Sequence, residues 1–234
     1  MHRFMIITSS IFILSALAFT DDIKNEDYIN LLTEPIEKAL EVRNAYAGLY
    51  RGHEFKPVPG LDNEDSVPFL KKILKEGLPD EKMVIKSRLA QCYAALCLGK
   101  IGDESVIEDL AAAVNTEHDK DSGGQITVKC VRAMGMIGTP KAKGEIYKIL
   151  KSDERKRVRD VSIAVLGESI NDKSDPYYEI LKKISNEDEN DDIKFAAGIA
   201  IERINIRIKE KEEKEKKEKE KEKSSEKNKT KEDN

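Results

Sequence analysis

The sequence predicts an all-α protein, a right-handed α-solenoid of stacked antiparallel helix pairs with a helical N-terminal cap and a long charged C-terminal helix or tail. Three observations favour this fold class. A unit of helix, turn and helix recurs at spacings of 36, 32 and 35 residues. Within each unit, apolar residues follow helical periodicity. The 234 residues include only 7 Pro and 13 Gly, and aromatic residues make up 6%, a composition that suits helices better than sheets.

The first 18 residues have the pattern of a signal peptide. Arg3 supplies the positive start, residues 4–17 are apolar apart from four hydroxyl residues, and Ala16-Leu17-Ala18 matches an A-x-A cleavage site. The apolar run is shorter than the ~20 residues that span a bilayer, although an uncleaved N-terminal anchor is the alternative. We therefore expect an exported protein, periplasmic or secreted, with no stable membrane insertion after signal cleavage.

Residues 19–83 form the predicted helical cap. Residues 28–50 carry apolar side chains in helical register, and residues 53–65 are rich in Pro and Gly and predict a loop. A further helix is expected to begin at Ser66 and to end at Gly77. These helices would cover the first repeat, because an open solenoid end exposes apolar surface.

Residues 84–208 contain about four repeat units whose first helices align column by column. One column holds small residues: Ala94, Cys130, Ser162 and Ala197. Three positions later the column is Cys97, Ala133, Val165 and Ala200, and the next is Leu98, Met134, Leu166 and Ile201. The column after that is Gly99, Gly135, Gly167 and Glu202. Small side chains let helix axes approach closely, and we expect each Gly to end its helix in a left-handed turn.

The second helix of each unit carries an apolar stripe of its own. The three stripes are Val106, Leu110, Ala113 and Val114; Ala142, Ile146, Ile149 and Leu150; and Tyr177, Ile180, Leu181 and Ile184. Asp103, Thr139 and Ser174 are the expected helix-start residues. A single helix pair cannot bury such a stripe, whereas stacked pairs can.

The repeat resembles the HEAT repeat, specifically the short bacterial form known as the HEAT-like or phycobilisome-lyase type. Gly99-Lys100-Ile101-Gly102-Asp103 and Val158-Arg159 match its pattern V-R-x-x-A-x-x-A-L-G-x-I-G-D most closely. The resemblance covers residues 84–208 and implies the solenoid fold, while a generic helical bundle is the alternative. It says little about function.

Residues 209–234 form a Lys/Glu-rich tail. Glu and Lys four residues apart, as at Glu210 and Lys214, stabilise a helix by ~0.2–0.5 kcal/mol per pair. We expect the last repeat helix to continue into this tail as a charged helix and the chain to be disordered after Ser224. The alternative is a polyelectrolyte arm that binds a surface or a partner.

The sequence predicts no catalytic residue, no cofactor and no metal site, and therefore not an enzyme. Neither His53 nor His118 has a second ligand at metal-binding spacing. Cys97 with His118 is the one conceivable nucleophile pair, and a lyase or hydrolase on this fold is the corresponding alternative. Phycobilin lyases share the repeat, but an exported chain does not fit their cytoplasmic role. We expect the three cysteines to be small buried residues, with a disulfide from Cys130 to an earlier cysteine as the alternative.

The expected binding surface lies on the second helices, which line the inner face in HEAT-like arrays. Its candidate partner-binding residues are Lys143, Tyr147, Lys151, Tyr178, Lys182 and Lys183. Tyrosine flanked by lysine makes an amphipathic contact surface. A net charge of −4 argues against nucleic acid as the partner. The sequence thus predicts a non-catalytic, exported scaffold that binds a protein. The alternatives are the enzyme above and an envelope-linking surface protein that uses the tail.

Overall fold

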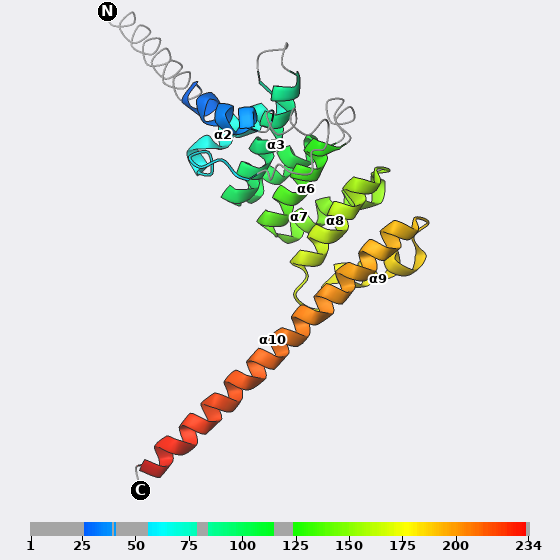
Figure 1. Cartoon of the computed structure of the whole chain (residues 1–234). Helices are drawn as coiled ribbons and strands as arrows, with labels where there is room; N and C mark the ends of the chain where they lie inside the picture. Colours follow the sequence, from blue (N-terminus) through cyan, green and yellow to red (C-terminus); the bar gives the residue numbers. More distant parts are fainter. Residues whose placement is uncertain (1–25, 39, 41–55, 79–83, 115–123, 233–234) are drawn as a thin grey trace, which may run out of the picture. The chain divides into compact units, whose positions relative to one another are not determined.

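The computed structural model describes residues 26–38, 40, 56–78, 84–114 and 124–232, and all regular structure in these ranges is helical (Figure 1). The elements are η2 (Glu64–Ser66), α2 (Val67–Glu76), α3 (Val84–Ile101), η4 (Glu104–Val106), α4 (Ile107–Ala112), α6 (Gln125–Ile137), α7 (Pro140–Ser152), α8 (Lys156–Ser169), α9 (Pro176–Glu187) and α10 (Asp191–Glu232). The all-α, solenoid-type fold class is confirmed, and the right-handed winding stays a prediction. The chain forms two compact units, Met1–Glu145 and Ile146–Asn234.

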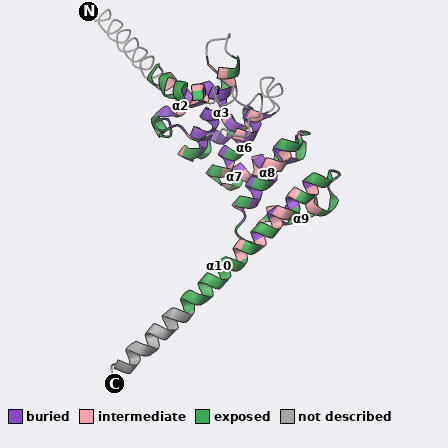
Figure 2. Cartoon of the chain, viewed as in Figure 1, coloured by how far each residue is buried: buried purple, intermediate pink, exposed green. Residues whose placement is uncertain are grey.

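The core of the first unit is built around α3. Every residue from Leu89 to Gly99 is buried, and all of them except Gln91 are apolar or glycine, as expected of a helix surrounded by neighbours. It packs against α2 and against α6, and Figure 2 shows buried residues concentrated there. Helix α3 is therefore the central element of this unit.

Residues before the repeats are tied to α3 by hydrogen bonds. The Tyr93 hydroxyl donates to the Pro35 carbonyl over 3.1 Å, and the Gln91 amide donates to the Leu74 carbonyl over 2.9 Å. Helix α2 ends where the sequence predicted, since Gly77 takes the left-handed φ of 74°. These contacts cover one face of the first repeat helix.

Gly99 is the point of closest approach between α3 and α6. A Cβ atom built on Gly99 would lie 2.5 Å from Ala133 Cα and 2.7 Å from Ala133 Cβ. No side chain fits there unless one helix moves. The small-residue columns predicted from the sequence therefore do bring two first helices together.

The predicted role of these glycines in ending helices was wrong. Gly99, Gly135 and Gly167 all lie inside their helices. The left-handed turn falls three residues later, at Gly102 with φ 79° and at Gly138 with φ 70°. In the first motif the two glycines have different roles: Gly99 admits a neighbouring helix, and Gly102 permits the turn.

In the second unit, α10 packs against both α8 and α9. A Cβ atom on Gly167 would lie 3.0 Å from Ala200 Cβ, which repeats the close approach seen at Gly99. Ser162 and Ala197 are fully buried, as are the matching residues Ala94 and Cys130 of the first unit. The first small-residue column is therefore a core column in both units.

Helix α10 is 42 residues long and continues the last repeat helix into the charged tail. We expected disorder after Ser224, whereas the structure describes helix as far as Glu232. Within the part expected to be helical, Glu and Lys at i, i+4 spacing support the helix, as at Lys209 and Glu213, whose charged atoms lie 4.0 Å apart. The residues after Ser224 lack such pairs, and we have no physical account of the helix there. All residues from 209 to 219 are exposed.

Several sequence predictions fall outside the described residues. These are the signal peptide (1–18), the end of the predicted helix 28–50, His53 and His118. Within the ranges that are described, no helix is long and apolar enough to cross a membrane.

Candidate functional site

The second unit contains a groove of about 460 Å³ between α7 and α9, closed at one end by α8. We call it the α7–α9 groove. Its lining residues are Tyr147, Leu150, Lys151, Arg159, Ile180, Lys183, Ile184, Glu187 and Asp188. Both long walls are second helices, as the sequence predicted for the binding face.

The groove brings together three of the predicted binding residues, Tyr147, Lys151 and Lys183. Lys182 is exposed on α9 but does not line the groove. Lys143 belongs to the other compact unit. Their role in binding a partner stays a prediction.

The prediction that Tyr178 is exposed was wrong. Tyr178 is only 8% exposed, and its hydroxyl donates to Asn205 Oδ1 of α10 over 3.0 Å. Tyr177, which the sequence assigned to the buried stripe, is instead half-buried. The adjacent tyrosines fit a helical stripe equally well from the sequence, and packing against α10 selects Tyr178 for burial.

Tyr147, which lines the groove, packs against Tyr177 of α9. The ring centroids of Tyr147 and Tyr177 lie 5.9 Å apart in an edge-to-face arrangement, which is a favourable aromatic geometry. Asp175 starts α9 by accepting a hydrogen bond from the Tyr177 backbone N–H over 3.0 Å, so it takes the role predicted for Ser174. Burial, followed by the nearby Asp175 carboxylate, raises the pKa of Tyr177, which keeps its hydroxyl protonated.

Arg159 closes one end of the groove and joins three elements. Its Nε donates to the Leu150 carbonyl of α7 over 3.3 Å, and its Nη2 forms an ion pair with the Asp188 carboxylate that follows α9. Burial alone would raise the pKa of Asp188. The hydrogen bonds from Arg159 and from the Asn190 backbone N–H outweigh it and hold the pKa below its usual value. The sequence analysis missed this role, although Arg159 stood in the matched Val-Arg motif.

The middle of the groove combines an apolar floor with two lysines. Leu150 is buried, and Ile180 and Ile184 are half-buried. Lys183 Nζ lies 3.8 Å from Glu187 Oε2, at the long end of ion-pair distances. Lys151 forms no ion pair or hydrogen bond with any other residue that the structure describes. An apolar surface is therefore bordered by ammonium groups that remain accessible.

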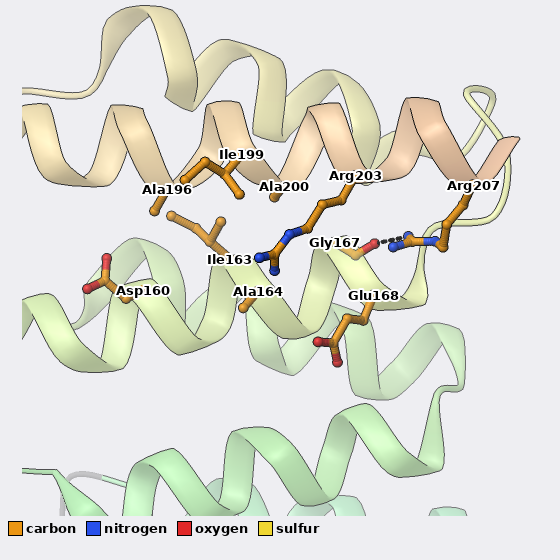
Figure 3. Close-up of a pocket in the computed structure, with 10 residues that line it drawn as sticks. All are labelled: Asp160, Ile163, Ala164, Gly167, Glu168, Ala196, Ile199, Ala200, Arg203 and Arg207. Carbon is orange, nitrogen blue, oxygen red and sulfur yellow. Dashed lines mark hydrogen bonds between the residues drawn. The ribbon is translucent and has the colours of Figure 1, made fainter. Parts of the chain in front are cut away.

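A smaller cleft, of about 250 Å³, lies between α8 and α10 (Figure 3). Arg207 donates to the carbonyl groups of Gly167 and Ile170, so it holds the end of α8 against α10. Arg203 reaches toward α8, where Asp160 and Glu168 also line the cleft (Figure 3). The two arginines balance the charge of the two carboxylates, so the cleft has no net charge that would favour a charged ligand. The hydrogen bonds of Arg207 indicate that its role is to pack α8 against α10.

Comparison with protein families identifies the repeat. Residues 90–116 match the model of the PBS lyase HEAT-like repeat. The chain therefore contains a segment similar to a HEAT-like repeat. The matched segment contains most of α3 together with η4 and α4, which is the first helix pair. A search of the curated proteins and a search of the solved structures found no match.

The three cysteines form no disulfide among the described residues and are buried, as predicted. Burial raises the pKa of the Cys97 thiol to about 11, although the Val58 backbone N–H donates to its sulfur over 3.2 Å. A thiol with this pKa is almost entirely protonated at neutral pH and is a poor nucleophile. Among the described residues, no cluster of His, Cys, Asp and Glu could hold a metal ion.

We predict that none of the three thiols reacts readily in the native protein. At pH 8 a thiol-specific disulfide reagent should modify Cys92, Cys97 and Cys130 at least ~100-fold more slowly than in denaturant, because both burial and the raised pKa of Cys97 oppose thiolate formation. Absorbance of the released thiol reports the rate. Rapid modification of Cys97 in the folded protein would contradict its protonated, enclosed state.

Proposed function

We propose that this protein is a non-catalytic scaffold, exported to the periplasm or beyond the cell, that binds a protein partner in the α7–α9 groove. The observation that carries the proposal is the groove itself. It is formed by two second helices, and it places an aromatic ring, an apolar floor and accessible lysines on one surface. Sites that bind other molecules are mostly apolar concave surfaces with a few polar groups.

The rigidity of the groove supports a role in recognition. Its Tyr147 side is fixed by ring packing between α7 and α9, and its Arg159 end is fixed by the hydrogen bonds of Arg159 to Leu150 and Asp188. A surface that is already ordered loses little conformational entropy when a partner binds. The α7–α9 groove is therefore suited to hold an incoming segment without rearranging.

Site-specific photo-crosslinking tests the groove as the binding surface. A photoreactive amino acid replaces Tyr147 in the full chain, and the control places it at Phe195, which is 71% exposed on α10. We expect a discrete crosslinked adduct from position 147 that disappears when Lys151→Glu and Ile184→Ala are added. Adducts of equal yield from both positions would contradict the groove as the binding surface. An adduct that persists when both substitutions are present would contradict it as well.

Export is tested separately by fractionation in a bacterial host. The expectation comes from the signal-peptide pattern of residues 1–18. The full-length chain should appear outside the cytoplasm, shortened by about 18 residues, and a chain without residues 2–18 should remain inside. Retention of the full-length chain in the cytoplasm would refute export while leaving the groove proposal standing.

A second candidate function uses the tail as an arm that attaches the protein to the cell envelope. The length of α10 favours it, since residues 209–232 extend the helix by about 36 Å at ~1.5 Å per residue. Both charge signs alternate along the exposed part. Removal of residues 209–234 should then release the protein from the envelope fraction, and unchanged fractionation would exclude this role.

A further inference from the structure

We propose that the segment bound in the α7–α9 groove is a short peptide that presents an apolar side chain next to carboxylates. This inference rests on the proposed function and adds the chemistry of the partner. Three properties of the groove carry it: its length, its half-buried isoleucines, and the balance of its charges.

The dimensions of the groove suit a short segment. The groove runs along α9 from Ile180 to Asp188, which is about 12 Å at ~1.5 Å per residue. An extended chain covers this length with about four residues at ~3.3 Å each.

The floor of the groove is suited to an apolar side chain. Ile180 and Ile184 belong to the stripe that the sequence predicts as core, yet both remain partly exposed in the structure. Leu150 lies beneath them and is only 1% exposed. An incoming leucine or isoleucine side chain would remove this apolar surface from water, which is the main favourable contribution to binding in such a site.

The charges around the floor favour a carboxylate on the ligand. Arg159 and Asp188 neutralise each other in a close ion pair, whereas Lys183 contacts Glu187 only at 3.8 Å. Lys151 has no ionic partner within the described residues and gives the lining a surplus of one positive charge. This surplus of positive charge would attract an acidic segment.

Three labelled heptapeptides test the proposal against the full-length mature chain. One alternates Glu and Leu, one alternates Lys and Leu, and one alternates Glu and Gly. Fluorescence anisotropy should show that the Glu/Leu peptide binds at least about tenfold more tightly than either other peptide, because exposed ion pairs each contribute a few-fold in affinity and the apolar side chain adds the rest. Raising the salt concentration should weaken its binding.

Matched variants connect any binding to the groove. Lys151→Glu with Lys183→Glu should reduce Glu/Leu binding about tenfold, and Ile184→Ala should reduce it about threefold. Lys217→Glu with Lys219→Glu makes the same change in net charge on the exposed tail and should leave binding unchanged. All of these positions are exposed or half-exposed, so the variants should fold.

The outcomes separate the partner chemistry from the proposed function. If the Lys/Leu peptide binds as tightly as the Glu/Leu peptide and still requires Ile184, the groove is a binding site but the preference for carboxylates is wrong. If the tail control weakens binding as much as the groove variants do, attraction is non-specific and the inference fails. If no groove variant changes the affinity of any peptide, the inference also fails. Crosslinking at position 147 then tests the proposed function independently.

Discussion

Gly99→Ala is expected to destabilise the folded protein by about 2–3 kcal/mol, the usual cost of forcing extra volume into a packed core. The added methyl group would lie 2.5 Å from the Ala133 Cα atom and 2.9 Å from its carbonyl oxygen. Both are backbone atoms, so α3 and α6 must separate rather than rotate a side chain away. For a chain of this size the thermal midpoint should fall by about 5–10 °C, measured by circular dichroism at 222 nm.

Gly198→Ala is the matched control, because the chemical change is identical and Gly198 is also inside a helix. A Cβ atom at Gly198 meets nothing within 4 Å. Alanine is a better helix former than glycine by about 1 kcal/mol, so this variant should be as stable as the parent or slightly more so. If both substitutions changed the midpoint equally, the close helix approach at Gly99 would be disproved.

Arg159→Ala is expected to destabilise the protein by about 2 kcal/mol, between the cost of losing an exposed ion pair and that of breaking a buried one. The substitution leaves the Asp188 carboxylate, with 12% of its side chain exposed, without its cation. It also removes a donor from the Leu150 carbonyl. Urea unfolding measures the loss, and Arg157→Ala, an exposed position on the same helix, is the control that should lose little.

The effect of Arg159→Ala should depend on pH in a defined direction. The pKa of Asp188 is lowered in the folded state, so its ionised form stabilises the fold above the unfolded pKa of about 3.9. That contribution is lost as the pH falls through the folded pKa. The difference in stability between the parent and Arg159→Ala should be constant above about pH 5 and shrink below pH 4. A difference that grows on acidification would exclude the Arg159–Asp188 ion pair as its source.

Much of the repeat architecture could be predicted from the sequence, because the small-residue columns report directly on how closely helices approach. Ala94, Cys130, Ser162 and Ala197 are fully buried as expected. The column position of Gly99 also identified a special residue, but not its role. Local propensity favours glycine at a helix end. The contact that requires a glycine at position 99 is made with Ala133, which is 34 residues later in the chain. A contact between residues so far apart cannot be read from a local sequence pattern.

The candidate site was predictable only in part. Tyr147 and Lys151, which the sequence placed on the exposed stripe of α7, both line the groove, because periodicity separates a buried face from an exposed one. Periodicity could not decide which of Tyr177 and Tyr178 is buried, because adjacent positions differ by only about 100° around a helix. The hydrogen bonds of Arg159 join α8 to the ends of α7 and α9. Such tertiary contacts leave no periodic pattern in the sequence.

Hydrogen–deuterium exchange of the full mature chain, with and without its crosslinking-identified partner, tests most directly whether the second helices form the binding surface. We predict that the partner slows amide exchange in α7 (Pro140–Ser152) and α9 (Pro176–Glu187), and leaves exchange in residues 209–219 unchanged. Slower exchange confined to the charged part of α10, with α7 and α9 unaffected, would contradict the account and place the binding function in the tail.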